Sequence, residues 1–127
     1  MTLAHATIGQ LMLPVSNVEE AIVFYRDVLG LPFLFAAPPQ MAFFMCGEVR
    51  LLVGVPPPGE PAQRGSAVYF KVGDIHATHA ALQEKGVVFA GAPHVVHRTP
   101  QYELWLAQFD DPDGNALLLM SEMAPRA

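Results

Sequence analysis

The sequence predicts an α+β fold built from two βαβββ modules in tandem. Three observations predict it: a strand and a capped helix occur twice, a glycine ends each helix, and a Pro- and Gly-rich stretch separates the two occurrences. The chain has 127 residues, 52% of them hydrophobic, which is enough for one ordinary domain with a substantial core. We expect a single domain over 1–127, with module one at about 7–54, a linker at 55–66 and module two at about 67–121.

Module one begins with a strand predicted over 7–15. Asn17 with Glu20 three residues later is typical of a helix N-terminus, and apolar residues at helical spacing predict an amphipathic helix over 18–28. Gly30 should end this helix. Three strands follow, the last two joined by a tight turn at Gly47: 31–36, 41–46 and 48–54.

Module two repeats this order. A strand is predicted over 67–72, Asp74 caps a helix over 75–85, and Gly86 ends it. The remainder is predicted as a short strand over 87–90, an irregular segment over 91–101, a long strand over 102–109, a tight turn over 110–114 and a strand over 115–121.

The two halves align on each other. Residues 13–18 (LPVSNV) match residues 70–75 (FKVGDI) at a constant shift of 57, and Gly30 matches Gly86 after a one-residue slip. Chance similarity of two capped helices is the alternative. The cap, the helix stop and the strand order agree together, however, and this agreement favours an internal repeat.

Composition excludes several classes of function. The net charge is −5 and the seven Lys and Arg residues are scattered, which argues against nucleic-acid binding. No stretch approaches the ~20 apolar residues of a membrane span. A single cysteine, Cys46, and the lack of a signal peptide pattern favour the cytoplasm. Charged residues are only 15%, so we expect an apolar face to be buried in a homodimer.

Two motifs resemble those of a known family. Residues 15–31 (VSNVEEAIVFYRDVLGL) and 109–115 (FDDPDGN) are similar to the opening and closing signatures of the vicinal oxygen chelate superfamily. This superfamily includes glyoxalase I, extradiol dioxygenases, fosfomycin-resistance enzymes and bleomycin-resistance proteins. The resemblance covers about residues 7–121 and implies a glyoxalase-like fold, in which the two modules form a U-shaped mixed sheet around an open cavity. It also implies a dimer, because members commonly complete their cavities across subunits.

The resemblance further implies where a metal would be held, because metal-dependent members place ligands on the first and last strand of each module. Carried over to this chain, these positions are Gln10, Leu51, Ala67 and Leu118. Only Gln10 has a donor atom, whereas a divalent metal needs several His, carboxylate or thiolate ligands. We therefore expect no metal and no other cofactor.

Strand alternation extends this inward-facing set into a predicted binding site. The predicted ligand-binding residues are Gln10, Met12, Leu51, Tyr69, Lys71, His97, Tyr102, Gln108, Leu118 and Met120. Trp105 is expected on the helix side. An apolar cavity with a few polar groups suits a small organic molecule. The alternative is that these side chains fill space or pack across a dimer interface.

The histidines fall into two groups. His94 and His97 lie on the irregular segment, where they could overhang the cavity as a base or a hydrogen-bond donor, or belong to a surface loop. His76 and His79 lie on the second helix and are predicted to face solvent or the edge of the helix. Cys46 is interpreted as an inert thiol.

These observations favour a protein that binds a small, partly apolar organic molecule between its sheets, similar to bleomycin-resistance proteins. Two alternatives stay open. One is a metal-free or substrate-assisted lyase or isomerase acting on a carbonyl compound, with Gln10, Tyr69, Lys71 or His97 polarising or deprotonating it. The other is a metal-dependent glyoxalase or dioxygenase with an unusual site. No catalytic residue is assigned.

Overall fold

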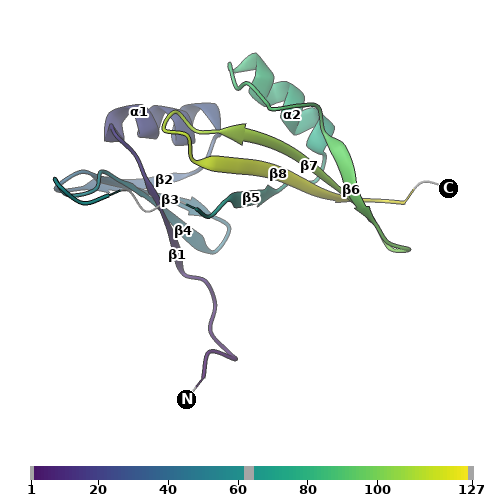
Figure 1. The fold of residues 1–127 in the computed structure, drawn as a ribbon, viewed down its shortest axis with the longest axis horizontal. Coiled ribbons are helices and arrows are strands. Elements are labelled where there is room, and N and C mark those ends of the chain that lie inside the picture. The colour runs from purple at the N-terminus through teal and green to yellow at the C-terminus, as the bar shows by residue number, and fades with distance from the viewer. Residues whose placement is uncertain (1, 62–64, 126–127) are drawn as a thin grey trace. The chain divides into compact units, whose positions relative to one another are not determined.

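A computed structural model describes residues 2–61 and 65–125 (Figure 1). The chain divides into two compact units, Met1–Arg64 and Gly65–Ala127, which we call module one and module two. Each module contains one four-stranded sheet with parallel and antiparallel pairs, and helical segments connect its first strand to its second. The predicted α+β class with tandem modules is confirmed.

Module one has the sheet order β1-β4-β3-β2, in which β1 is parallel to β4 and the other pairs are antiparallel. Its elements are β1 (Gln10–Pro14), α1 (Val18–Ile22), the π-helix η1 (Val23–Val28), β2 (Phe33–Ala37), β3 (Met41–Cys46) and β4 (Val49–Gly54). Module two has the equivalent order β5-β8-β7-β6. Its elements are β5 (Val68–Lys71), α2 (Ile75–Glu84), β6 (His94–Arg98), β7 (Glu103–Asp110) and β8 (Ala116–Met123).

Both helices begin and end as the sequence predicts. The Asn17 side chain accepts a hydrogen bond from the Glu20 N–H at 2.9 Å, and Asp74 accepts from two backbone N–H groups at 3.0 and 3.1 Å. These bonds satisfy donors that have no partner within the first helical turn. Gly30 and Gly86 follow the helices with φ of +77° and +93°, a left-handed conformation that favours glycine.

The helices also explain the one-residue slip of the repeat. Val18 and Tyr25 are buried in module one, and their counterparts 57 residues later, Ile75 and Leu82, are buried in module two. The slip therefore falls after Tyr25. There the helix of module one is wound as a π-helix, which accommodates one extra residue per turn, whereas α2 stays a regular α-helix.

Two predictions for module two are wrong. Residues 91–101 are not irregular throughout, because His94–Arg98 pairs with β7 as the outer strand β6. The predicted strand at 87–90 is instead a single bridge between Phe89 and Phe109. The β-branched Val95 and Val96 favour extended pairing, and Pro93, which has no N–H to donate, lies just before the strand.

The closing motif of the sequence builds the turn between β7 and β8. Asp111, which is 4% exposed, accepts hydrogen bonds from the Asp113 and Asn115 N–H groups at 2.9 and 2.8 Å, and from the Asn115 side-chain amide at 2.7 Å. Gly114 adopts φ of +84°. The motif therefore specifies a turn rather than a reactive site. Among the described residues, no helix is long and apolar enough to cross a membrane.

Candidate functional site

In each module the helical layer covers one face of the sheet, and the opposite face is called here the helix-free face. In module one the Tyr25 ring contacts the Phe44 ring at 5.7 Å between centroids, so Phe44 points to the helix side. Phe44 pairs with Leu51, which is 2% exposed and therefore lies on the same buried side. The alternate residues of these strands form the helix-free face.

The helix-free face of module one is rich in methionine and aromatic side chains. Gln10 pairs with Arg50 and Met12 pairs with Leu52 across β1 and β4, which brings the predicted Gln10 and Met12 together. The face comprises Gln10, Met12, Phe35, Met41, Phe43, Met45, Arg50 and Leu52. Met12 is 47% exposed. This face combines apolar side chains with one amide and one cation.

The prediction that Leu51 lies on the ligand-binding face, which is the helix-free face, is wrong. Leu118 in module two pairs with Tyr69, and the counterpart of that pair in module one is Leu52 with Met12. Leu118 follows its turn glycine by four residues, but Leu52 follows Gly47 by five. Because side chains alternate with a period of two, this one-residue difference moves Leu51 to the helix side.

Aromatic and cationic groups stack on this face. The rings of Phe35 and Phe43 are stacked with centroids 4.6 Å apart, and the Arg50 guanidinium carbon lies 5.8 Å from the Phe43 centroid. Met12 and Met41 lie against Gly54, because a Cβ atom there would be 3.5 Å from Met12 Cε and 3.4 Å from Met41 Cγ. None of Phe35, Phe43 and Arg50 was predicted, because their neighbourhood depends on how β2, β3 and β4 pair.

In module two, Trp105 faces the helix as predicted, since its ring lies 4.8 Å from that of His76 on α2. The residues that alternate with Trp105 form the helix-free face. Five predicted residues come together there in two cross-strand rows: Tyr69–Leu118–Gln108, and Lys71–Met120 followed by Leu106. Strand alternation was sufficient to identify them.

An ion pair lies on this face. Lys71 Nζ is 3.2 Å from Glu122 Oε1, and the Lys71 side chain is 64% exposed. Glu122 was not predicted, because it lies beyond the expected end of the last strand. The Glu122 carboxylate beside it opposes the attraction of Lys71 for a ligand anion.

The two histidines of β6 lie on the same side of the sheet. His94 pairs with Leu106 and His97 with Leu104, while a bulge between Val95 and His97 takes up the extra residue. His94 and His97 are exposed, and His94 Nδ1 lies 3.1 Å from the Ala92 carbonyl oxygen. His97 therefore belongs to the helix-free face, on an outer strand rather than on an overhanging loop.

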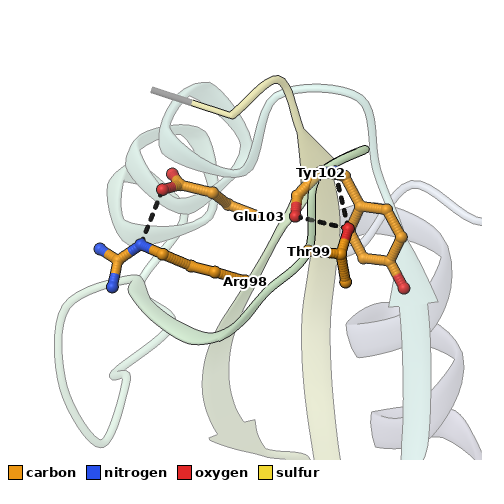
Figure 2. Close-up of polar contacts among 4 residues, drawn as sticks. All are labelled: Arg98, Thr99, Tyr102 and Glu103. Carbon is orange, nitrogen blue, oxygen red and sulfur yellow. Dashed lines mark hydrogen bonds and ion pairs between the residues drawn. The ribbon is translucent and has the colours of Figure 1, made fainter. Parts of the chain in front are cut away.

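Tyr102 closes the hairpin between β6 and β7 (Figure 2). The Thr99 hydroxyl donates to the Tyr102 carbonyl oxygen at 3.1 Å and accepts from the Tyr102 N–H at 2.9 Å. Figure 2 shows the Tyr102 ring directed away from the Glu103 carboxylate, which binds Arg98 at 2.8 Å. Glu103 is 4% exposed, so Arg98 balances a buried charge instead of being free for a ligand anion.

The helix histidines differ from each other. His76 is exposed, but His79 packs against Phe89 at 4.2 Å between ring centroids, and its Nε2 atom is buried without a hydrogen-bond partner among the described residues. His79 is therefore half-buried at the edge of the helix, which is the second of the two positions predicted for it, and does not face solvent. Burial raises the pKa of the Cys46 thiol, which lowers its thiolate fraction and agrees with an inert cysteine.

No group of three or more His, Cys, Asp or Glu side chains within 2–61 and 65–125 could hold a metal ion. Module one also contains an open depression of about 640 Å³, lined by residues 16–19 and 36–41. It was not predicted. The Asn17 side-chain oxygen in its wall is already used to cap α1.

Comparison with known proteins places this fold in a family. The family model described as Glyoxalase/Bleomycin resistance protein/Dioxygenase superfamily matches residues 7–119. The chain is 31% identical over 122 residues to YraH of Bacillus subtilis (strain 168), covering 85% of this chain and 92% of that protein.

Two solved structures show the same fold. One is a member of the Glyoxalase/bleomycin resistance protein/dioxygenase superfamily from Sphaerobacter thermophilus DSM 20745, with a TM-score of 0.77, 24% identity and coverage of 92% of this chain and 98% of that one. The other is TnmS3, an antibiotic binding protein from Streptomyces sp. CB03234, with a TM-score of 0.72, 27% identity and coverage of 95% and 99%. The chain therefore belongs to the glyoxalase/bleomycin resistance protein/dioxygenase superfamily, as its two signature motifs predicted.

Proposed function

We propose that this protein binds a small, partly apolar organic molecule on the helix-free faces of its sheets, without a metal ion. The helix-free face of module two carries the proposal, because Leu118 and Met120 lie beside Tyr69 and Gln108. A mostly apolar surface with a few polar groups is typical of small-molecule sites. The likeness to the antibiotic binding protein TnmS3 supports this reading.

The residues at the family's metal-ligand positions do not fit a divalent metal. With the register corrected, these positions hold Gln10, Leu52, Ala67 and Leu118, and only Gln10 offers a donor atom. Such metals require several His, carboxylate or thiolate donors. Elemental analysis of protein purified without chelator should find Ni, Zn, Fe and Mn well below stoichiometric amounts. One metal ion per chain would contradict the proposal.

The alternative of a metal-free lyase or isomerase gains no support from Lys71 and His97 as a pair. Lys71 and His97 lie on β5 and β6, the two outer strands of the sheet. Neighbouring strands are about 4.8 Å apart, so these residues are separated by roughly 14 Å. An acid–base pair must reach one common point. Lys71 is in addition paired with Glu122.

Titration calorimetry against a panel of aromatic antibiotics and aromatic metabolites tests the binding function. Tyr69 is 51% exposed on the helix-free face, and we expect Tyr69→Ala to weaken binding of a panel member about tenfold. The control is Val23→Ala, which removes an equally exposed side chain on η1. Absence of binding across the panel would contradict the proposal, as would an equal loss in both variants.

We also propose that the protein is a homodimer. Three large apolar side chains on the helix-free faces, Met12, Phe35 and Tyr69, are 47%, 46% and 51% exposed. Exposed apolar patches of this kind commonly mark association surfaces. Analytical ultracentrifugation should show a dimer, and a monomer that persists at high concentration would contradict this.

A further inference from the structure

Two polar side chains lie next to each other on the helix-free face of module one. Gln10 on β1 is the cross-strand partner of Arg50 on β4. The backbone N–H of Arg50 donates to the Gly9 carbonyl oxygen at 2.9 Å, which fixes this register. Paired residues of adjacent strands are about 5 Å apart and point to the same face. The Gln10 amide and the Arg50 guanidinium can therefore donate to one shared oxyanion.

Arg50 is available for such an anion. Arg26, Lys71 and Arg98 each form an ion pair, but Arg50 forms none with any residue in 2–61 or 65–125. It is also the one charged residue among those of this helix-free face. Its guanidinium carbon lies 5.8 Å from the Phe43 centroid, and a guanidinium that lies over an aromatic ring can still donate hydrogen bonds from its N–H groups.

The fold itself does not require this pair. In module two the positions equivalent to Gln10 and Arg50 are occupied by Ala67 and Ala116, and the same strand arrangement forms without them. The two modules thus act as an internal control. The strand pairing therefore does not depend on an amide and a guanidinium side by side in module one, which leaves these two groups available for recognition of a ligand.

The neighbouring side chains are apolar. Met12 lies two residues beyond Gln10, Leu52 lies two residues beyond Arg50, and Phe43 pairs with Leu52. We infer that Gln10 and Arg50 bind the carboxylate of a small aromatic acid, whose rings lie over Met12, Leu52 and Phe43. This inference rests on the proposed binding function and gives its ligand a chemical class: an organic anion, complementary to the lone cation of the face.

Paired probes of equal shape test the inference. Uniformly ¹⁵N-labelled full-length protein is titrated with 2-naphthoate and with the neutral 2-naphthamide, and the Arg50 Nε–H and Gln10 amide resonances are followed. We expect the carboxylate to bind about tenfold more tightly than the amide, as a charge-assisted hydrogen bond implies. Arg50→Gln should abolish this preference and Arg50→Lys should retain part of it. Arg26→Gln is the matched control, since Arg26 is paired with Asp27, and should leave the preference unchanged.

The outcomes separate this inference from the function on which it rests. Equal binding of both probes to the wild type overturns the carboxylate site and leaves the binding function intact, as does a preference that survives in Arg50→Gln. If neither probe binds but a neutral member of the antibiotic and metabolite panel does, the carboxylate site is likewise overturned. If nothing binds, both fail. Gln10 and Arg50 resonances that respond to protein concentration but to neither probe would show that a second copy closes this part of the face to ligands, which also overturns the inference.

Discussion

Module one and module two have the same strand order and the same helix caps, yet their helix-free faces differ. Module one presents methionine and phenylalanine with a single cation, Arg50, that has no acidic partner in the described part of the chain. Module two presents Tyr69, exposed histidines and the Lys71–Glu122 ion pair. The helices, by contrast, keep buried apolar residues at matching positions, as Val18 and Ile75 or Tyr25 and Leu82. Repeated residues therefore maintain the fold, and the residues that differ are candidates for ligand recognition.

Adjacent leucines on β4 should give the largest contrast between the two kinds of face. Leu51→Ala creates a cavity under the helix and should lower the free energy of unfolding by about 2–5 kcal/mol. Leu52→Ala removes a half-buried side chain from the helix-free face and should cost about 1 kcal/mol or less. Urea unfolding followed by circular dichroism measures both. A larger loss of stability in Leu52→Ala than in Leu51→Ala would indicate that Leu51 lies on the helix-free face and Leu52 on the helix side.

Asp111 stabilises the last turn of module two through three hydrogen bonds. Asp111→Ala leaves two N–H groups and the Asn115 amide without their acceptor, so we expect a loss of about 2–3 kcal/mol in the free energy of unfolding. Asp110→Ala, at an exposed position of the same motif, should change it by less than about 0.5 kcal/mol. Equal losses in the two variants would argue against a structural role for the Asp111 network.

The extra residue of the module one helix provides a test of the repeat. Asp27 lies after Tyr25, the last buried position that matches between the two helices. Its deletion should convert η1 into a regular α-helix like α2 and lower the free energy of unfolding by less than about 1 kcal/mol. Deletion of Ala80 in α2 rotates Leu82 by about 100° away from the core and should cost roughly 2 kcal/mol or more. Chemical denaturation gives both values. Equal costs would mean that the π-helix is not an insertion into a repeated helix.

Local chemistry made much of this fold predictable. Helix ends depend on a cap residue and a glycine within a few positions, so Asn17, Asp74 and Gly86 could be identified from the sequence. Alternation within one strand likewise identified Tyr69 and Gln108 as residues of the helix-free face.

The errors arise where prediction had to cross a turn or an irregularity. Counting from Gly47 placed Leu51 on the wrong face, because a shift of one residue in register moves every side chain of a strand to the opposite face. The bulge in β6 interrupts the alternation of its side chains, so the sequence of this strand resembled that of an irregular loop. Arg50 and Glu122 were missed because their importance comes from partners on other strands, which no local pattern specifies.

The smallest expected effect concerns a position at which the two helices differ. His79 corresponds to Ile22 at the constant shift of 57, and its Nε2 atom is buried without a hydrogen-bond partner in the described residues. An unsatisfied buried polar atom destabilises a fold, so His79→Ile should raise the free energy of unfolding by up to about 1 kcal/mol. His76→Ile, at an exposed position one turn earlier, is the control and should change stability by less than about 0.5 kcal/mol. A clear loss of stability in His79→Ile would show instead that the imidazole has a polar partner in solution, and that module two uses this histidine where module one uses an apolar contact.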